Sequence, residues 1–291
     1  MLFNKVMDSI ETKASQSILR DSSDYIDDEG LLMCGKCHTR KQCVVEVFGK
    51  KRMPYCLCKC AQEKAEAEKA ALERQERMKK IDELRNMGFP DEEMKNWTFI
   101  NDDQGNPEAS EVARRYVANF PKMIEKGKGL LFYGNVGSGK TYLAACIANA
   151  LIDKGHPCLV TNFPRLLNTI HGMYEGKQQY IDGLNKFDLL VIDDLAAERD
   201  TEYMNETVQN IIDNRYRCGK PLIVTTNLSL NDIQNPADIK KQRTYSRLAE
   251  MCFYIKVISK DRRKNRYDSD YQEFKELLGL DKTRKNRLES G

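Results

Sequence analysis

The sequence predicts an α/β domain with a parallel five-stranded sheet, preceded by a small cysteine-rich module and a charged helix. Three observations carry this prediction. Short apolar runs alternate with helical stretches from about residue 96 to 260, six of the ten cysteines fall within residues 31–60, and residues 61–85 contain 14 charged side chains but no Gly or Pro. We therefore expect an N-terminal module over 1–60, a helical linker over 61–90, the α/β domain over 91–266 and a basic tail over 267–291.

The alternation of apolar runs and helical patterns indicates a parallel sheet with helices on both faces. We expect helices at Thr141–Lys154 and Thr201–Arg217, among others, and strands at Gly129–Tyr133, Cys158–Thr161, Phe187–Ile192, Pro221–Thr225 and Phe253–Ile258. The charged segment before them has few large apolar residues. It is expected to form a solvent-exposed spacer helix or a partner helix.

The overall composition bounds the class of protein. The 47 basic and 44 acidic residues give a net charge of +3, so any basic binding site must be local. No apolar run is long enough to span a bilayer, and the N-terminus carries Asp8 and Glu11 where a signal peptide requires an apolar stretch. We expect a cytoplasmic protein without membrane contact, in which clustered cysteines bind metal rather than form disulfides.

A phosphate-binding loop follows the first of these strands. The segment Gly134–Thr141 fits the pattern G-x-x-x-x-G-K-[ST], in which backbone N–H groups surround the phosphates, Lys140 reaches the β- and γ-phosphates and the Thr141 hydroxyl binds Mg²⁺. This loop alone predicts ATP or GTP with Mg²⁺. The expected nucleotide-binding residues are Gly134, Asn135, Val136, Gly137, Ser138, Gly139, Lys140, Thr141 and Tyr142.

Two later strands end in polar residues that suit the same site. Asp193 and Asp194 end the run that begins at Phe187; Asp193 suits a Mg²⁺ ligand, and Asp194 suits a group that polarises the attacking water. Asn227 follows the run that begins at Pro221, where it could reach the γ-phosphate or could simply cap a turn.

Two arginines further along are candidates for phosphoryl stabilisation. Arg243 and Arg247 are four residues apart and would share one face of a helix. Because a guanidinium suits the charge of a transferring phosphoryl group, one of them could act on the ATP of a neighbouring subunit. The alternative is a solvent-exposed pair on the surface.

The cysteines form two groups at metal-ligand spacing. Cys34-x-x-Cys37 is followed, after 18 intervening residues, by Cys56-x-Cys58-x-Cys60. Thiolates at such spacing can share one tetrahedral Zn²⁺, and a module of about 30 residues needs such a metal in order to fold. Five thiols for four positions leave the ligand set open, and unrelated reduced thiols or a redox site are the alternatives.

The order and spacing of these motifs resemble the DnaC/IstB-type AAA+ ATPases, a family of bacterial and phage helicase loaders and transposition helper ATPases. The resemblance covers about residues 84–266 and rests on the phosphate-binding loop together with Leu-Leu-Val-Ile-Asp-Asp-Leu, Val-Thr-Thr-Asn-Leu and Tyr-Ser-Arg-Leu-Ala-Glu-Met-Cys. It includes the lead-in Glu93–Asp102, which lies beside the adenine pocket in such proteins. The implied fold is a P-loop AAA+ ATPase domain.

The resemblance also implies roles for single residues. It assigns Walker A to Lys140 and Thr141, Walker B to Asp193 and Asp194, sensor 1 to Asn227, the arginine finger to Arg247 and sensor 2 to Arg263. Many relatives carry Glu at the position of Asp194, so the shorter side chain predicts slower hydrolysis. The segment around Arg263 departs from the usual pattern, which leaves Arg262 as an alternative.

For the cysteines, the resemblance favours a zinc site of Cys34, Cys37, Cys58 and Cys60, because the last two directly precede the charged helix; Cys56 is the substitute. The implied function is loading a hexameric replicative helicase onto single-stranded DNA, by subunits that assemble through their ATP sites. The N-terminal module would grip the helicase. An IstB-like transposition helper, a weakly hydrolysing ATP-bound nucleic-acid adaptor and a small-molecule kinase are the alternatives; the zinc module argues against the helper, and Asn227 and Arg247 argue against the kinase.

Overall fold

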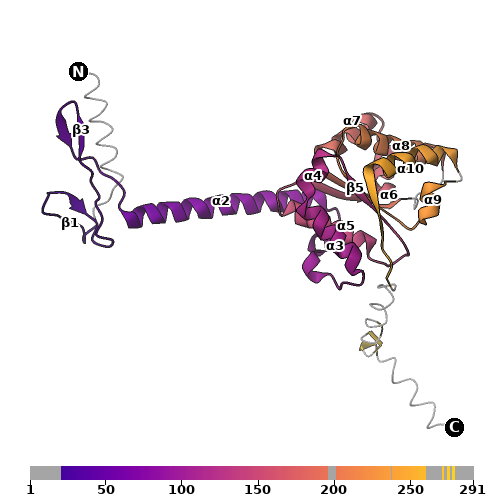
Figure 1. Cartoon of the computed structure of the whole chain (residues 1–291), viewed down its shortest axis with the longest axis horizontal. Helices are drawn as coiled ribbons and strands as arrows, with labels where there is room; N and C mark the ends of the chain where they lie inside the picture. Colours follow the sequence, from indigo (N-terminus) through magenta and orange to yellow (C-terminus); the bar gives the residue numbers. More distant parts are fainter. Residues whose placement is uncertain are drawn as a thin grey trace, which may run out of the picture. The chain divides into compact units, whose positions relative to one another are not determined.

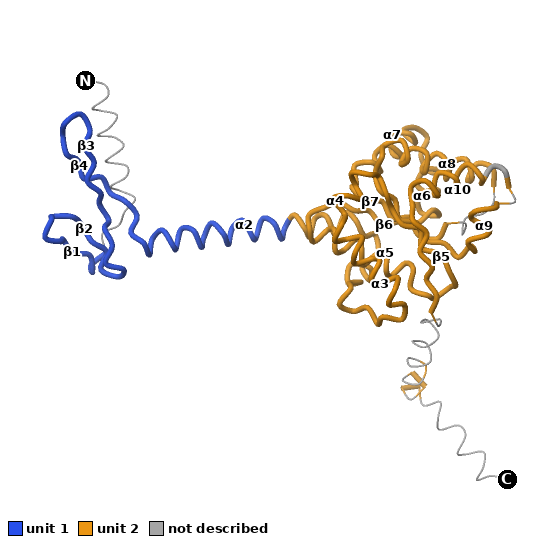
Figure 2. Tube along the Cα trace, viewed as in Figure 1, with its two compact units in different colours: residues 1–79 blue, residues 80–291 orange. Residues whose placement is uncertain are grey.

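The structure, a computed structural model, describes residues 21–195, 201–236 and 238–259, together with 271, 274–275 and 277–278. The chain divides into two compact units, residues 1–79 and 80–291 (Figure 2). The boundary falls inside one long helix, α2 (Lys59–Gly88), which contains nearly all of the predicted linker.

The helix α2 is the predicted charged helix; it begins two residues before the expected linker, residues 61–90, and ends two residues before the end of that linker. Only Ile81 and Gly88, towards its C-terminal end, are buried, so most of the helix has no apolar face to pack. Its helical state follows from the absence of Gly and Pro before its last residue, Gly88, and from oppositely charged side chains four residues apart. Such ion pairs, with N–O distances of 3.8–4.0 Å, join Lys59 to Glu63, Lys64 to Glu68 and Lys69 to Glu73.

The described part of unit 1 contains two short antiparallel hairpins before α2. β1 (Tyr25–Ile26) pairs with β2 (Leu32–Met33), and β3 (Val45–Val47) pairs with β4 (Lys50–Arg52) (Figure 1). The buried apolar side chains among its described residues are few: Leu31, Leu32, Cys34 and Cys58. So small a core cannot stabilise a fold alone, which points to a metal as the additional source of stability.

Unit 2 contains the predicted parallel five-stranded sheet, with the strand order β6-β7-β8-β5-β9. Each strand overlaps a predicted run. The largest difference is in β7, which extends to Leu195 and so includes both predicted acids. The strands are β5 (Gly129–Tyr133), β6 (Cys158–Asn162), β7 (Leu189–Leu195), β8 (Leu222–Thr226) and β9 (Cys252–Lys256).

Helices cover both faces of this sheet. Leu130 and Phe132 of β5 pack in one apolar core with α3 (Pro107–Ala118) and α5 (Lys140–Ile152). Leu131, between them, packs in a second core with α6 (Phe163–His171), α8 (Glu202–Arg217) and α10 (Ile239–Met251). Two buried faces explain why the strands read as continuous apolar runs.

Shorter helices complete the unit, and no described helix is both long and apolar enough to cross a membrane. They are η1 (Glu93–Asn96), η2 (Phe99–Asn101), α4 (Phe120–Glu125), α7 (Lys177–Gly183), η3 (Leu184–Lys186) and α9 (Leu230–Gln234).

A buried arginine holds the segments that lead into two neighbouring strands, β7 and β8. The guanidinium of Arg215 donates to the carbonyl oxygens of Phe187 at 3.0 Å, Asp188 at 2.9 Å and Pro221 at 2.7 Å. Burial lowers its pKa to about 10. Because these carbonyls lead into β7 and β8, Arg215 helps to set the register in which the far ends of the strands meet.

Candidate active site and metal site

The loop between β5 and α5 turns through glycines with left-handed backbones. Gly134 has a φ of 144°, and a Cβ there would lie 2.1 Å from the carbonyl oxygen of Val257. Gly139, at a φ of 96°, precedes the first residue of α5. On its outer side the loop is fixed by Asn135 Nδ2, which donates to the carbonyl oxygen of Ser259 at 2.9 Å. The loop therefore presents the N-terminal N–H groups of α5 in the geometry that binds phosphate.

The ammonium of Lys140 lies where three chain segments meet. Its Nζ donates to Asn227 Oδ1 at 2.8 Å and to the carbonyl oxygens of Gly134 at 3.0 Å and Asn135 at 2.8 Å. Lys140 begins α5 and Asn227 directly follows β8, so these contacts bring together two residues that the sequence placed in one site.

Thr141 and Asp193 form a pair of oxygen ligands. Thr141 Oγ1 donates to Asp193 Oδ1 at 2.8 Å. Burial raises the pKa of Asp193, although hydrogen bonds from Thr225 and Thr141 act in the opposite direction. A bound cation would offset the cost of burying this carboxylate, and hydroxyl and carboxylate oxygens are ligands that Mg²⁺ prefers. The residues present therefore fit the predicted Mg²⁺ site.

A β-bulge in β7 gives the two neighbouring acids, Asp193 and Asp194, different backbone conformations. The register between β7 and β8 shifts at this point, and Asp194 has a left-handed φ of 56°. Thr225 of β8 donates from Oγ1 to Asp193 Oδ1 and accepts the backbone N–H of Asp194 at 3.0 Å. Sequence reasoning gave Thr225 no role. The available signal was a polar side chain in an apolar strand, and here it is fully buried.

A pocket of about 430 Å³ lies over the loop, within the size range of small-molecule sites. The rings of Trp97 and Tyr142 lie 5.6 Å apart and give it an aromatic wall. Asn149 of α5 holds the predicted lead-in beside the pocket by donating to the carbonyl oxygens of Met94 and Trp97. The lining residues are Glu93, Trp97, Val136, Gly137, Ser138, Gly139, Lys140, Thr141, Tyr142, Asp194 and Asn227.

Arg247 lies on α10 and does not line this pocket. Its guanidinium forms an ion pair with Asp213 of α8 and lies 4.3 Å from the centre of the Tyr216 ring. Arg243 Nη2 lies 3.1 Å from Asp213 Oδ2, the carboxylate oxygen that does not face Arg247. Asp213 as a residue is only 7% exposed. Sequence reasoning did not single out Asp213, because it comes from an earlier helix and only the fold brings it to the arginines.

The predicted sensor 2 residue, Arg263, and its alternative, Arg262, lie outside the described residues.

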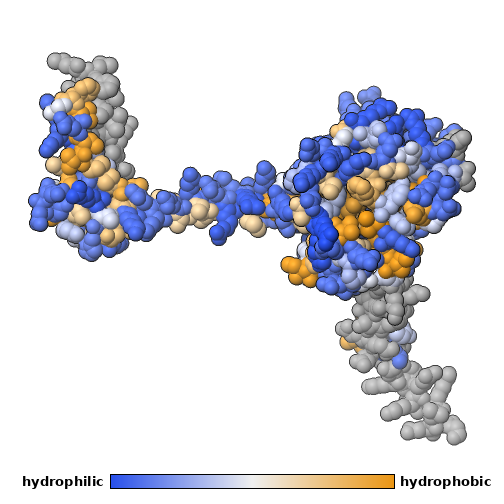
Figure 3. Space-filling view, in the orientation of Figure 1, coloured by the Kyte–Doolittle hydropathy of each residue, from blue (hydrophilic) through white to orange (hydrophobic). Residues whose placement is uncertain are grey.

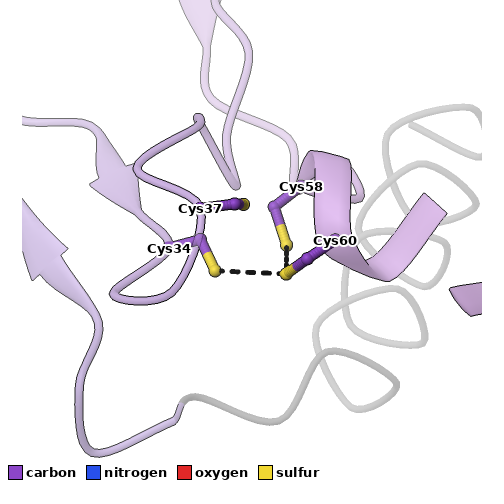
Figure 4. Close-up of side chains that lie close together, drawn as sticks. All are labelled: Cys34, Cys37, Cys58 and Cys60. Carbon is purple, nitrogen blue, oxygen red and sulfur yellow. Dashed lines mark hydrogen bonds between the residues drawn. The ribbon is translucent and has the colours of Figure 1, made fainter. Parts of the chain in front are cut away.

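Four cysteine sulfurs of unit 1 lie within 4.8 Å of one another (Figure 4): Cys34, Cys37, Cys58 and Cys60. Cys34 and Cys37 flank the turn after β2, and Cys60 lies in the first turn of α2 rather than before the helix as expected. The sulfur of Cys60 is 3.4 Å from that of Cys58 and 3.6 Å from that of Cys34. Thiolates that share a tetrahedral Zn²⁺ with bonds of about 2.3 Å lie about 3.8 Å apart, so the set fits zinc.

Cys56, the predicted substitute, is not part of this cluster among the described residues. Its Sγ lies 3.7 Å from the carbonyl oxygen of Arg40, and burial together with the nearby Cys43 raises its pKa. The imidazole of His38 is also outside the cluster and lies 3.2 Å from the hydroxyl of Tyr25.

The four clustered thiols differ in acidity. A hydrogen bond from the Thr39 hydroxyl, with smaller contributions from backbone N–H groups, lowers the pKa of Cys37 to about 5. Backbone N–H groups lower the pKa of Cys34, whereas the neighbouring sulfurs, Cys58 first, raise the pKa of Cys60 to about 12. The thiolate form is therefore favoured at Cys34 and Cys37, whereas the charge of the neighbouring sulfurs opposes it at Cys60. A bound divalent cation would offset this repulsion and stabilise the thiolates together.

Comparisons with known proteins agree with the motifs. The family described as IstB-like ATP binding protein matches residues 60–265. The uncharacterized protein YqaM of Bacillus subtilis is 31% identical over 176 residues, which cover 56% of this chain and 54% of YqaM. The replicative helicase loader DnaC of Escherichia coli is 28% identical over 171 residues, which cover 56% of this chain and 69% of DnaC. The match to YqaM thus spans about half the length of that protein.

A crystal structure of DnaI is similar in fold. It is 25% identical, with a TM-score of 0.50, over 59% of this chain and 96% of the DnaI chain. The predicted resemblance and the predicted α/β fold with a parallel five-stranded sheet are therefore confirmed.

Proposed function

This chain belongs to the IstB-like ATP binding protein family, and we propose that it is an ATPase that loads a hexameric replicative helicase onto single-stranded DNA. The convergence of three strand ends on one pocket carries the ATPase part of the proposal. Homology to the loaders DnaC and DnaI carries the choice of client.

The polar side chains at the end of the loop and of the two following strands each have a task in ATP hydrolysis. The N–H groups of the loop and the Lys140 ammonium bind the β- and γ-phosphates. Thr141 and Asp193 hold Mg²⁺, which neutralises phosphate charge when bound. Asp194 polarises the attacking water, and Asn227 orients that water and the γ-phosphate. Because Asp194 is one methylene shorter than Glu, we expect slow turnover.

Arg247 acts on the ATP of a neighbouring chain in this proposal. It lies outside the pocket of its own chain, and Asp213 and Tyr216 hold its guanidinium. An arginine supplied in trans stabilises the charge on the transferring phosphoryl group. ATP would then link adjacent subunits, and hydrolysis would loosen them.

The cysteine module supports a loader over an IstB-like transposition helper. It supplies a separate unit that can hold a client while unit 2 binds ATP and DNA. A weakly hydrolysing ATP-bound adaptor is a second candidate, which Asp194 favours because of its short side chain.

The ATPase proposal is tested by ATP turnover of the full chain with and without single-stranded DNA, beside Lys140→Ala. We expect the parent to hydrolyse ATP above the Lys140→Ala background and to respond to DNA. Saturable ATP binding with turnover no higher than that background would favour the adaptor.

The client is tested by capture of a hexameric replicative helicase on the immobilised full chain, beside capture of a transposase. We expect helicase capture by the parent and reduced capture by Cys58→Ser. Equal helicase capture by a Cys58→Ser protein that has lost its zinc would contradict the role given to the module.

A further inference from the structure

The tip of the β3–β4 hairpin carries an aromatic side chain that folding does not explain. Phe48 and Gly49 form the two-residue loop, with φ values of 54° and 70°. Positive φ at both positions is the backbone of a type I′ turn, in which Asn or Asp is favoured at the first position. Phe48 therefore has the strain of a left-handed backbone, and at 88% exposure it gains no buried contact in return. Such an outlier points to a functional side chain.

The hairpin is also the basic part of the module. Between Cys34 and Cys60 the sequence holds seven basic residues and one acidic residue, Glu46. Three of the basic side chains lie outside the hairpin and form ion pairs with acids near β1: Lys36 with Asp21, Arg40 with Glu29 and Lys41 with Asp24. β4 adds three consecutive cations, Lys50, Lys51 and Arg52. Acidic charge thus gathers at β1 and positive charge at β4.

Exposed apolar side chains share one face of the hairpin with Lys51, whereas Lys50 and Arg52 lie on the other face by the same register. Val44, Met53 and Tyr55 are each well exposed, and by the register of the strands they share one face of the hairpin. In Figure 3, orange apolar atoms and blue hydrophilic atoms lie next to each other on this hairpin.

The hairpin is built directly on the cysteine cluster. Backbone N–H groups extend its ladder towards that cluster: Cys43 donates to the carbonyl oxygen of Pro54 at 3.0 Å, and Cys56 donates to that of Lys41 at 2.8 Å. Cys58 then follows after one residue. A metal held by the cluster would therefore fix the base of the hairpin, while its tip stays exposed.

We propose that the β3–β4 hairpin, residues 44–55, binds single-stranded DNA, with a base stacked on Phe48 and phosphates on Lys50, Lys51 and Arg52. Cations beside an exposed aromatic ring are the features by which proteins bind single strands without sequence preference. Residues 44–55 hold three basic residues and one acidic residue, Glu46, which lies across the strands from Lys51. This net positive charge favours a polyanion over an apolar protein partner. This inference rests on the proposed function only in its choice of DNA, and it adds a DNA contact in unit 1.

Fluorescence anisotropy with a labelled oligo-dT tests this contact on the full chain, without nucleotide and at several salt concentrations. Phe48→Asn suits the left-handed turn, so the hairpin is kept while the ring is lost. We expect this variant to bind about 5- to 150-fold more weakly, the effect of one base–aromatic stack, and we expect Phe48→Trp to bind like the parent. The double variant Lys50→Gln/Lys51→Gln is expected to lower the salt slope by about 1.4.

The matched control is Lys64→Gln/Lys69→Gln, which removes the same charge from exposed positions of α2 and is expected to change neither affinity nor slope. A 5-iododeoxyuridine crosslink is expected in the tryptic peptide that spans residues 42–50. Parent-like affinity of Phe48→Asn together with no crosslink in that peptide would overturn the proposal. Loss of helicase capture by Phe48→Asn with unchanged DNA affinity would also overturn it, because the hairpin would then be a protein-docking surface.

ATP turnover separates this test from that of the proposed function. A parent that hydrolyses ATP while Phe48→Asn binds DNA as well as the parent would overturn only the hairpin contact. A parent without turnover would overturn the ATPase, whatever the hairpin binds.

Discussion

Lys140 Nζ donates to Asn227 Oδ1 at 2.8 Å, which joins the start of α5 to the end of β8 at the pocket. The amide thus holds the ammonium that is expected to meet the γ-phosphate. A residue in this position can influence hydrolysis more than binding, because the loop N–H groups still hold the phosphates when the amide is removed.

Asn227→Ala is therefore expected to lower ATP turnover about 10- to 100-fold while nucleotide affinity changes much less. Phosphate release and nucleotide titration measure the two effects. Asn235→Ala is the control, because Asn235 lies beyond α9, pairs with Asn231 and does not line the pocket. If Asn227→Ala hydrolysed ATP as fast as Asn235→Ala, the assigned role would be wrong.

Nucleotide binding is expected to change the emission of Trp97. It is the only tryptophan of the chain, it lines the pocket, and its ring lies against Tyr142. A titration with Mg²⁺–ATP is expected to give a saturable change in the parent and little change in Lys140→Ala. Constant emission at concentrations that saturate turnover would show that the nucleotide binds away from Trp97.

Asp193→Asn is expected to separate stability from function. Burial raises the folded-state pKa of Asp193, so its ionisation costs stability; this cost appears as the pH rises through the unfolded-state pKa and is complete above the folded-state pKa. Asn keeps the Oδ1 acceptor of Thr141 and Thr225 but removes the charge. At pH 7 we expect the variant to melt at a higher temperature than the parent without ligand and to lose the stabilisation by Mg²⁺–ATP. A variant that melts lower, or that keeps the Mg²⁺–ATP shift, would contradict this account.

The zinc content of single cysteine variants tests the metal site. We expect the parent to bind one zinc ion per chain and Cys58→Ser to lose it, because the remaining three sulfurs no longer complete a tetrahedron. Cys56→Ser is the matched control, two residues away and outside the cluster, and is expected to keep the metal. Elemental analysis after dialysis measures both. The opposite result, with zinc kept by Cys58→Ser and lost by Cys56→Ser, would assign the site to Cys56.

The parts of the candidate site that follow from the sequence are local. The segment Gly134–Thr141 defines its own backbone, because its glycines, lysine and threonine act at fixed separations along one turn. The five strands were found because both faces of the sheet are buried, which makes each strand a continuous apolar run. Asp193 and Asn227 became candidates because each ends an apolar run that follows the phosphate-binding loop.

The features that the sequence could not provide depend on contacts between distant segments. Thr225 holds both acids only because a bulge places Asp194 in a left-handed backbone, and nothing near these residues predicts the bulge. Asp213 reaches Arg247 from another helix. Cys56 and Cys58 are equivalent by spacing alone. The resemblance favoured Cys58, and the structure adds the reason that Cys56 lies outside the cluster: its backbone still pairs with Lys41 in the strand ladder.

Mixing two impaired variants tests whether Arg247 of one chain completes the ATP site of another. Lys140→Ala loses its own phosphate site but keeps Arg247, and Arg247→Ala keeps its pocket but loses the arginine. We expect each variant alone to hydrolyse ATP at least about 10-fold more slowly than the parent, and their mixture to exceed the sum of the two. A mixture no more active than that sum, together with an Arg247→Ala variant as active as the parent at every protein concentration, would contradict a site shared between chains.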